Sequence, residues 1–478
     1  MPRNYKVSKY IKRFDKDGYT ALFNGLSLKK AYGRSDVIDS LIKEIKKPYV
    51  LGKSKLADDL IENEFFIRPD WDSRRFNELK NTVGKIKISN VVLLVSNDCN
   101  YACKYCQIEE NIEESQKKFN MPIEVAKKAL DLFEKNCLNE DKKTITITGG
   151  EPLMNIETVK YIIERAGGIP DSRVIMFTNG SLVTEKLADY FSKTDTLILV
   201  SLDGTREIND SVRVNMNGSG TFDISLRGYE LLKKAGCKTG ISAVTGLHNV
   251  DRMDEVSDLF TRLAPPSVGL NFGHYLLGKE NPTAIEMRRF AQLLTKFYQD
   301  MRARNIYLEN ISRFITPFCE EKPRLNECQA EGRGFSVDSR GRIGVCKSLL
   351  VSDDISMPID DIAENISDEP VFQEWSKRSP FTLKECADCR VIGICGGGCA
   401  YDSYAVNNGD IDKIDPKICD YTNKVLEFLI WDLFGAIIKD KIGAAVYVPT
   451  AREQKENFLK YYGPENDLQR SVGHEKDR

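Results

Sequence analysis

Apolar runs alternate with amphipathic stretches through the middle of the chain, between residues 90 and 304. A stretch with helical periodicity follows each of six short runs rich in β-branched residues: VVLLVS (91–96), TITIT (144–148), VIMFT (174–178), TLILVSL (196–202), GISAVT (240–245) and SVGLNF (267–272). Nearly continuous apolar strands that alternate with helices indicate a parallel sheet covered on both faces. We therefore expect an α/β fold of barrel type, with candidate site residues just beyond the carboxyl ends of the strands.

The first 85 residues have a different pattern, with short strands followed by two amphipathic stretches. The predicted strands are residues 10–14, 19–23, 26–32 and 65–67, and the predicted helices are residues 35–45 and 54–64. We expect a small winged-helix-like module over residues 1–85. The polar stretch DWDSRRFNELKN (70–81) reads as a linker.

Residues 301–425 carry eight cysteines and show little long periodicity, so bound metal is expected to replace part of the core there. An apolar helical stripe follows in residues 422–440, which we expect to pack against the barrel or the cysteine-rich region. The tail, residues 463–478, is expected to be frayed or disordered. The predicted domains are residues 1–85, 86–300, 301–425 and 426–478.

Composition excludes several classes of protein. The 478 residues are 41% hydrophobic and 29% charged, and the net charge of −2 gives no general sign of nucleic-acid or membrane binding. No apolar run reaches the roughly 18 residues of a membrane span, and the N-terminus has no apolar signal core. A cytoplasmic location is expected. In that reducing compartment, the 13 cysteines are better explained by metal ligation than by disulfides.

Three of these cysteines follow the first predicted strand: Cys99, Cys103 and Cys106. A structural zinc site needs four ligands, and none of the three histidines (His248, His274 and His474) lies near this run. A four-iron cluster held by three thiolates leaves one iron open to a small molecule. The spacing therefore favours an iron–sulfur cluster with an open iron, and zinc is the alternative.

The arrangement Cys99-x3-Cys103-x2-Cys106, with aromatic Tyr105 before the last cysteine, resembles the signature of radical S-adenosylmethionine (SAM) enzymes. The resemblance implies a partial (β/α)6 barrel of TIM type over residues 86–300. It also implies a [4Fe-4S] cluster whose open iron binds the amine and carboxylate of SAM. An electron from a donor such as flavodoxin or ferredoxin would then give a 5′-deoxyadenosyl radical.

Two further motifs agree with this resemblance. TGGEP (148–152) is similar to the family segment that receives the methionine amino group, which implies cofactor contacts from Gly149, Gly150, Glu151 and Pro152. SLDGTREINDSVR (201–213) resembles the fourth-strand segment of the peptide-modifying branch. There Ser201 and Asp203 are implied to meet ribose or carboxylate, and Arg213 is a cation for the carboxylate unless it forms a surface salt bridge. The branch usually has His-Asp where this chain has Asn209-Asp210, so a role for that position is in doubt.

The later cysteines resemble the SPASM extension of peptide and sulfatase maturases, which holds auxiliary iron–sulfur clusters. By the family pairing, Cys328, Cys346 and Cys399 hold auxiliary cluster I, which Cys319 could complete. Cys386, Cys389, Cys395 and Cys419 hold auxiliary cluster II. The resemblance implies three [4Fe-4S] clusters, the auxiliary ones serving electron transfer. Two zinc knuckles are the alternative, and Cys137 and Cys237 are expected to be structural thiols.

The N-terminal module is the main indication of a substrate. It resembles the leader-recognition elements of ribosomal peptide pathways, in which a leader adds as a strand to a sheet edge and packs against a helix. Residues 1–55 hold 14 Lys and Arg against 5 Asp and Glu, a net of +9, which would favour an acidic leader. Nucleic-acid binding and a mere packing extension are the alternatives for this module.

The function expected from these features is oxidative cross-linking of a ribosomally made precursor peptide, through a thioether, carbon–carbon or carbon–oxygen bond. A formylglycine-forming enzyme of the anaerobic sulfatase-maturing type is the alternative enzyme. A zinc-ribbon, winged-helix nucleic-acid-binding protein is the alternative without catalysis. The expected partners are the precursor peptide and the electron donor, with no nucleic acid and no membrane.

Overall fold

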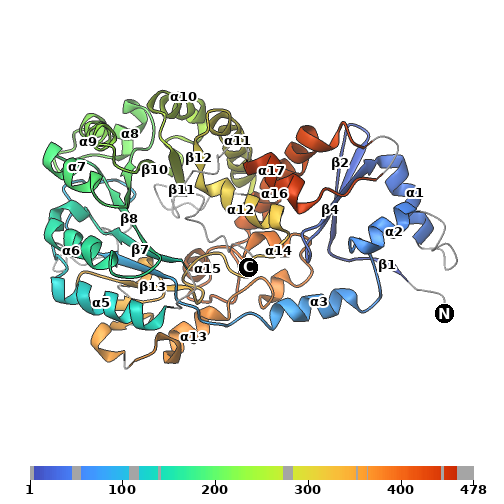
Figure 1. The fold of residues 1–478 in the computed structure, drawn as a ribbon, viewed down its shortest axis with the longest axis horizontal. Coiled ribbons are helices and arrows are strands. Elements are labelled where there is room, and N and C mark those ends of the chain that lie inside the picture. Colours follow the sequence, from blue (N-terminus) through green and yellow to red (C-terminus); the bar gives the residue numbers. More distant parts are fainter. Residues whose placement is uncertain are drawn as a thin grey trace.

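The computed structural model describes residues 5–45, 55–106, 118–137, 142–272, 284–350, 354–362, 364–442 and 446–459. Figure 1 shows an elongated molecule, with the strand–helix units at one end and the N-terminal module at the other. The cysteine-rich region, in orange, lies between and beneath them. The expected disorder of residues 463–478 falls outside the described residues.

The six predicted strands are confirmed, and they lie side by side in the order of the sequence. They are β6 (Asn90–Leu94), β7 (Lys143–Thr148), β8 (Ser172–Thr178), β9 (Thr196–Ser201), β10 (Thr239–Thr245) and β11 (Ser267–Phe272). Each pairs in parallel with the next. Their carboxyl ends therefore meet along one rim, where the candidate site lies.

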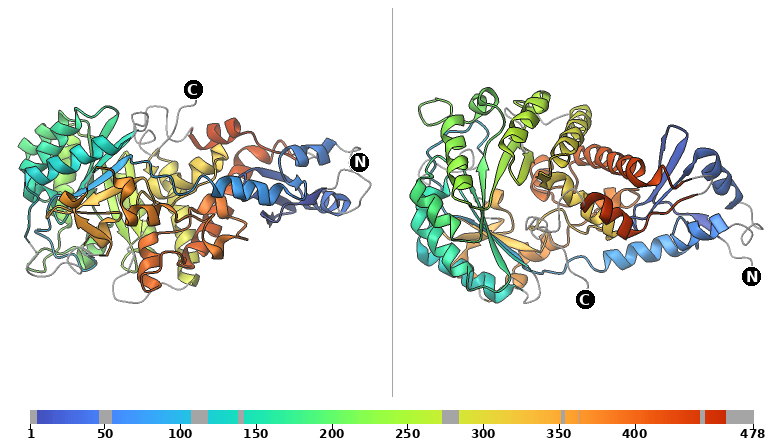
Figure 2. Two further views of the ribbon diagram at one scale, coloured as in Figure 1. Left: turned by 90° about the horizontal axis from the view of Figure 1, so that it is seen from below. Right: turned by 45° about the horizontal axis from the view of Figure 1, so that its top comes forward.

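Helices cover the outer face of this curved sheet, as Figures 1 and 2 show. They are α5 (Ile123–Asn136), α6 (Ile156–Ala166), α7 (Glu185–Ser192), α8 (Arg206–Val212), α9 (Phe222–Lys234), α10 (Met253–Leu263) and α11 (Ala284–Arg302), with a short 3₁₀ turn at Pro152–Asn155. The sequence predicts all of these helices except α8. That helix has seven residues, too few to show a helical period.

The main sheet continues beyond the six strands on both sides. Strand β12 (Tyr307–Leu308) pairs in parallel with β11, and β13 (Gly334–Val337) pairs in parallel with β6. A hairpin of β14 (Arg342–Gly344) and β15 (Ser356–Pro358) completes the ten-stranded order β12-β11-β10-β9-β8-β7-β6-β13-β14-β15. Part of the cysteine-rich region therefore belongs to the same sheet as the barrel strands.

The N-terminal module contains a three-stranded antiparallel sheet with helices on one face. Its strands are β2 (Ile11–Lys16), β3 (Tyr19–Asn24) and β4 (Lys30–Arg34), followed by α1 (Ser35–Ile45) and α2 (Lys55–Glu62); β1 (Lys6–Val7) pairs with β5 (Phe66–Ile67). The segment predicted as a linker is a helix, α3 (Trp71–Lys80), which lies between the module and the first barrel strand. Phe76 of this helix contacts Tyr10 and Phe381, and the buried Asp72 accepts a hydrogen bond from Ser8 Oγ (2.6 Å), so tertiary contacts hold a largely polar sequence in place.

The other face of the module's sheet packs on the body of the protein. Phe14, Phe23 and Tyr32 belong to the main hydrophobic core, together with residues of α16 (Lys417–Leu433). The predicted C-terminal helix is thus confirmed, and it contacts the barrel helix α11 as well as the module. A π-helical turn at Phe434–Ile438 ends it.

The remaining helices are α12 (Glu309–Glu320) and α17 (Ala451–Leu459), which pack together, and the short α13 (Pro370–Ser376), α14 (Ile392–Cys395) and α15 (Ala400–Val406). Among the described residues, no helix combines the length and the apolar character that crossing a bilayer would require.

Candidate active site

The first cysteine group lies in the loop that follows β6. Backbone hydrogen bonds hold this loop against the chain just after α8: Ala102 N donates to Val214 O (2.8 Å), and Lys104 N donates to Val212 O (2.9 Å). Tyr101 adds a hydroxyl contact of 3.0 Å with Ser225 in α9. The loop is therefore fixed by the fourth strand–helix unit, which also carries the SLDG motif.

The three thiols of this loop are half-buried and lie near one another. Burial raises the pKa of Cys99 to about 12 and that of Cys103 to about 11, and the charge of Cys106 contributes to both rises. The Arg213 guanidinium opposes this rise at Cys103. A set of three soft sulfur donors beside one cation fits a negatively charged iron–sulfur cluster, so the residues present suit the group that the motif implies.

Gly149 and Gly150 are required by the close approach of two loops. Gly150 N donates to Ser96 O (2.6 Å), and Glu151 N donates to Asp98 O (2.8 Å). A Cβ on Gly150 would lie far inside van der Waals contact of the Asp98 carbonyl. The glycines thus set the path of the chain immediately before Cys99.

Glu151 is fully buried, and its carboxylate is bound by three protein groups. It accepts hydrogen bonds from Leu153 N (3.0 Å), Thr178 Oγ1 (2.7 Å) and Asn179 N (2.7 Å). Burial raises the pKa of this carboxyl above its usual value, against these hydrogen bonds, which lower it. The carboxylate ties the GGEP turn to the end of β8, and its contact with a methionine amino group stays a prediction.

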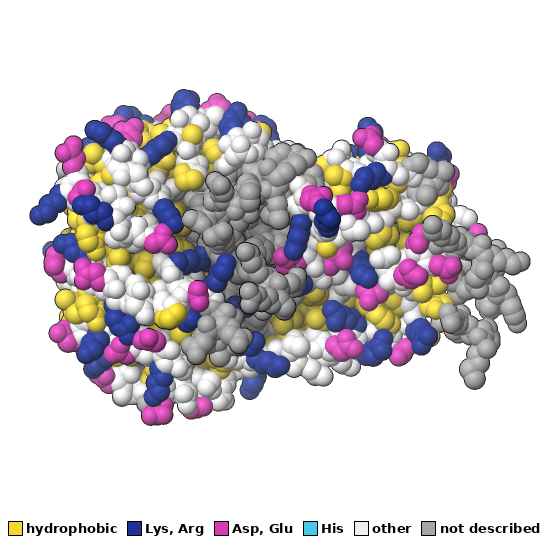
Figure 3. Space-filling model, in the orientation of Figure 1, with side chains coloured by type: hydrophobic (Ala, Val, Ile, Leu, Met, Phe, Trp, Pro, Cys, Tyr) yellow, Lys and Arg dark blue, Asp and Glu magenta, His cyan; other side chains and the backbone are white. Residues whose placement is uncertain are grey.

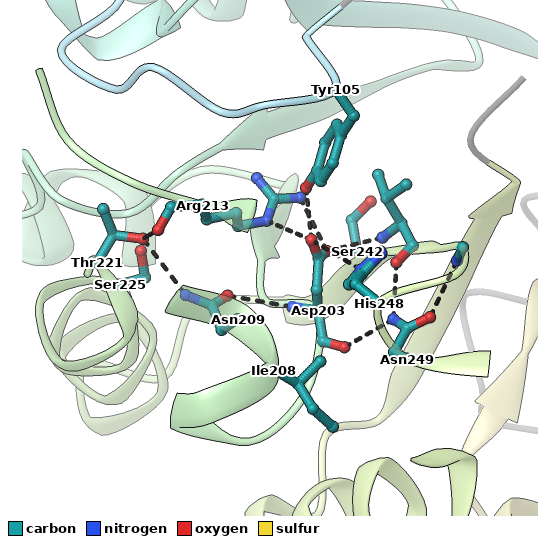
Figure 4. A network of polar contacts seen from close by, with 12 residues as sticks. Tyr105, Asp203, Ile208, Asn209, Arg213, Thr221, Ser225, Ser242, His248 and Asn249 are labelled. Atoms are coloured by element: carbon teal, nitrogen blue, oxygen red, sulfur yellow. Dashed lines mark hydrogen bonds and ion pairs between the residues drawn. The ribbon is translucent and has the colours of Figure 1, made fainter. Parts of the chain in front are cut away.

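Asp203 is the centre of the polar network in Figure 4. Its carboxylate accepts hydrogen bonds from Tyr105 Oη (2.5 Å), Arg213 Nη2 (3.0 Å) and Val244 N (2.8 Å). Burial alone would raise the pKa of Asp203, but the Arg213 charge and the polar contacts with His248, Arg213 and Tyr105 hold it at about 2. Arg213 is only 7% exposed, so its ion pair with Asp203 is buried and is not a surface salt bridge.

His248 belongs to this network, although no sequence motif marks it. Its ring stacks on Tyr105, with 6.0 Å between centroids, and its Nε2 lies 3.6 Å from Asp203 Oδ2. The side chain is 4% exposed, and neither ring nitrogen has a hydrogen-bond partner among the described residues. It follows β10 in a loop that carries no recognisable motif, so only the tertiary structure brings it to Tyr105.

Asn209 and Asp210 take structural roles next to the site. Asn209 Oδ1 accepts a hydrogen bond from Asp203 N (3.3 Å), and Asp210 Oδ1 accepts from Thr221 N and Phe222 N (both 2.8 Å) at the start of α9. Ser201 is the last residue of β9, two residues before Asp203. Pro152 begins the 3₁₀ turn after Glu151.

The later cysteines divide into two sets by the charges that act on them. Burial raises the pKa of every one of these thiols. In addition, the charge of Cys346 raises the pKa of Cys328, and the charges of Cys328 and Cys346 raise the pKa of Cys399. In the second set, the pKa of Cys386 is raised by the charges of Cys395, Cys389 and Cys419. These neighbours agree with the pairing that the family resemblance implies, and the two auxiliary clusters themselves stay a prediction.

Arg378 connects the two sets, and the sequence did not indicate it. This fully buried side chain forms an ion pair with Glu331 (2.8 Å) near Cys328. It also donates to the carbonyls of Gly397 (3.0 Å) and Gly398 (2.7 Å), between Cys395 and Cys399. One guanidinium therefore fixes the loops that carry members of both sets.

Cys319 has a different environment. It lies near the end of α12 in the hydrophobic core, and after burial the charge that acts on it most strongly is that of Lys30 in β4. Lys30 Nζ donates to the carbonyl of the adjacent Phe318 and is itself fully buried. Cys137 caps the end of α5, and Cys237 follows α9, as expected of structural thiols.

Among the described residues, no group of three or more His, Cys, Asp or Glu side chains is arranged to hold a single metal ion. A four-iron cluster is wider than one ion, and each thiolate binds a different iron. The three sets of thiols are soft donors and are free of disulfides, so their chemistry suits such clusters.

Comparison with known proteins gives a family match for the barrel. Residues 93–260 match the radical SAM superfamily. The chain is 23% identical to the radical SAM cyclopropyl synthase TigE of Paramaledivibacter caminithermalis, over 89% of this chain and 88% of that protein.

Two solved structures share the fold. One is native anSMEcpe with bound AdoMet (TM-score 0.60, 20% identity, 73% of this chain and 98% of that one). The other is Streptococcus suis SuiB bound to the precursor peptide SuiA (TM-score 0.53, 15% identity, 87% of this chain and 99% of that one). These two likenesses concern the fold, whereas the family match shows that residues 93–260, which include the thiol loop after β6, form a radical SAM domain.

Proposed function

We propose that this radical SAM enzyme is a peptide maturase that installs an oxidative cross-link in a ribosomally made precursor. The observation that carries the proposal is the grouping of ten thiols into three sets. Forming a bond after removal of a hydrogen atom requires the loss of one more electron. Two thiol sets beyond the SAM loop suit a pair of clusters that take up electrons.

Cys99, Cys103 and Cys106 would hold the cluster that binds SAM. When bound, the cluster and SAM supply a 5′-deoxyadenosyl radical, which takes a hydrogen atom from an unactivated carbon. The buried pair of Asp203 and Arg213 fixes the Tyr105 ring beside this loop. We assign His248 to the same site, where its nitrogens, which have no hydrogen-bond partner among the described residues, would bind polar groups of SAM.

The later thiols would hold the remaining clusters of the predicted three. Cys328, Cys346 and Cys399 form one site, and Cys386, Cys389, Cys395 and Cys419 form the other. Over the whole reaction the precursor loses one hydrogen atom, one proton and one electron. The product is therefore about 2 Da lighter than the precursor, from the loss of two hydrogens.

The relatives support a peptide substrate. The similarity to TigE covers 89% of this chain, more than the barrel alone. A cyclopropyl synthase forms a carbon–carbon bond, so among the three link types we favour a carbon–carbon link. The N-terminal module is proposed to bind the leader of the precursor as an added strand.

The charge of the N-terminal module gives less support to an acidic leader than the sequence suggested. Its basic side chains pair with acidic ones: Arg13 with Asp39, and Lys9 with Asp388 on the body of the protein. Figure 3 shows Lys and Arg interspersed with Asp and Glu on the visible face of the module. The charges that steer a partner are therefore smaller than +9 implies.

The test is to co-express the protein under anaerobic conditions with a short peptide encoded beside it and to measure the peptide mass. A peptide about 2 Da lighter with a new carbon–carbon bond is expected. The matched control replaces Cys99, Cys103 and Cys106 by Ala and should give an unmodified peptide. An aldehyde in place of a Cys or Ser side chain would favour the sulfatase-maturing alternative, and an unchanged mass would contradict the proposal.

A further inference from the structure

A short segment near the C-terminus occupies one edge of the module's sheet. Tyr447 N donates to Tyr32 O (2.7 Å), and Tyr32 N donates to Tyr447 O (2.8 Å), so the two residues pair as neighbours in antiparallel strands. We call residues 446–450 the strap. The views in Figures 1 and 2 agree that this red part of the chain runs beside the blue strands.

The strap places its side chains as a β-strand does, on alternate faces. Val446 and Val448 belong to the apolar cluster of the module, with Ile38 and Leu41 of α1. Tyr447 contacts the main core on the opposite face and donates a hydrogen bond to Glu453. The edge of β4 and the apolar face of α1 thus already accommodate an extended strand with apolar residues at positions i and i+2.

The groove for this strand is shaped by Gly33 of β4. A Cβ at this position would lie 3.0 Å from Ile38 and 3.3 Å from Val446, closer than side chains normally approach. The absence of a side chain therefore leaves the space that Val446 fills between β4 and α1.

The strap is a weak occupant of this edge. Within the described residues its pairing with β4 is a single isolated bridge, whereas β4 itself has five residues. In an antiparallel ladder every second residue presents its N–H and C=O to the neighbouring strand. A longer extended peptide could therefore form more hydrogen bonds with β4 than the strap does.

A cavity of about 430 Å³ lies on the same helix, lined by Asp36, Val37, Ser40, Leu41, Glu44 and Leu56. Leu41 and Val37 also belong to the apolar cluster that Val446 joins, so the cavity adjoins the groove. Its charged residues, Asp36 and Glu44, are acidic. A peptide that extends from the groove into this cavity would be favoured by an apolar residue next to a Lys or Arg.

We propose that the edge of β4, together with α1, is the docking surface for the precursor, and that the strap covers it until the precursor takes its place. The partner is an extended peptide with apolar residues at i and i+2 and a basic residue nearby. This inference rests on the proposed function, because it takes the precursor as the partner. The strap acts as an internal competitor and lowers the apparent affinity for the precursor.

The first test uses a fluorescent synthetic peptide of residues 441–450, added to the full chain in its holo form. Tyr447→Pro removes the N–H that bonds Tyr32 and should free the edge. This variant is expected to bind the peptide at least about tenfold more tightly than the wild type. Tyr447→Phe keeps the backbone bonds and should behave as the wild type, and a peptide with Asp in place of both valines should not bind. Equal binding to Tyr447→Pro and the wild type would overturn the docking surface.

The second test needs no variant and uses amide hydrogen exchange of the wild type with the peptide encoded beside the gene. Displacement of the strap predicts faster exchange at Tyr447 and retained protection at Tyr32. A precursor that is bound and modified while Tyr447 stays protected would refute the docking surface and leave the proposed function intact. If the precursor fails to bind while the peptide of residues 441–450 binds Tyr447→Pro, the edge accepts a strand but the proposed function is wrong.

Discussion

At the scale of single residues, the candidate SAM site depends on one buried ion pair. Asp203 is completely buried, and its carboxylate is held by Arg213, Tyr105 and the backbone of β10. Loss of one partner from a buried pair leaves an unpaired charge, which typically costs about 3–5 kcal/mol. Arg213 and Asp203 are therefore poor positions at which to test cofactor contacts, because their variants would lose stability as well.

His248 offers a cleaner test. His248→Phe keeps the ring against Tyr105 and removes two nitrogens that have no hydrogen-bond partner among the described residues. We expect thermal stability to change little, because the substitution breaks no hydrogen bond that the structure describes, although it loses the 3.6 Å approach of Nε2 to the Asp203 carboxylate. SAM affinity should fall about tenfold, the value of one hydrogen bond of roughly 1.4 kcal/mol. Isothermal titration calorimetry with SAM measures the affinity of the variant and of the wild type.

Tyr190→Phe is the control for His248→Phe, because it also removes a buried polar atom without a partner among the described residues, and it lies on α7 outside the network of Figure 4. Its SAM affinity should equal that of the wild type. Equal SAM affinity of His248→Phe and the wild type would remove His248 from the cofactor site.

Cys319 can be separated from the auxiliary ligands by iron content. Cys346→Ala should lose about four irons per chain, because Cys346 belongs to the first auxiliary set. Cys319→Ala should keep the iron content of the wild type, because the strongest charge on Cys319 is that of Lys30. Iron analysis of both proteins after anaerobic reconstitution makes the comparison. An equal loss of iron from the two variants would show that Cys319 is a ligand of auxiliary cluster I.

At the scale of elements, the site is built where loops from neighbouring strands pack backbone to backbone. The turn after β7 lies against the loop after β6, and the loop after β6 is bonded to the segment after α8. Such contacts depend on glycine, because any side chain at Gly149 or Gly150 would overlap the carbonyl groups of Ser96 or Asp98. Displacing one loop is therefore expected to displace the next.

Gly150→Ala tests this coupling. The added methyl group would overlap the Asp98 carbonyl and should move the chain that leads into Cys99. We expect less iron at the SAM cluster and a lower melting temperature. Gly269→Ala in β11 is the matched control, since a Cβ there meets nothing within 4 Å and the backbone is not in the left-handed region. Full iron content in Gly150→Ala would show that the loops are not coupled.

At the scale of the whole molecule, the N-terminal module shares the main hydrophobic core with the rest of the protein. Phe14, Phe23 and Tyr32 lie in the main core, Tyr32 Oη donates to Ile430 O (3.1 Å), and Gly393 N donates to Gly25 O (3.0 Å). Removing the module would expose the apolar side chains of α16 that these residues cover. The strap would also lose the strand with which it pairs.

Deletion of residues 1–80 is therefore expected to lower the melting temperature by several degrees and to cause association in size-exclusion chromatography. The cause is the apolar surface left on α16, not the loss of a binding site. Tyr447→Phe, which keeps the interface, should remain monodisperse. A deletion variant that stays monodisperse with an unchanged melting temperature would show that the module only docks loosely.

Local sequence determined most of the elements and predicted the candidate iron ligands. The six barrel strands have nearly continuous apolar runs, which are typical of buried parallel strands. The spacing of Cys99, Cys103 and Cys106 can be read directly from the sequence. Charge counting along the chain was less informative, because Arg13 and Lys9 meet their acidic partners only in the fold. The helix α3 was not predicted because its sequence is largely polar, and tertiary contacts of Phe76 with Tyr10 and of Asp72 with Ser8 hold it in place.

Only the tertiary structure decided which distant groups share an environment. His248 reaches Tyr105 across 143 positions of sequence, and Arg378 joins loops on either side of it; neither has a local signal. The pairing of Tyr447 with Tyr32 is equally invisible in sequence, because an edge strand accepts any extended backbone. Periodicity and spacing are local properties, whereas partners of buried charges and strand edges are set by chain packing.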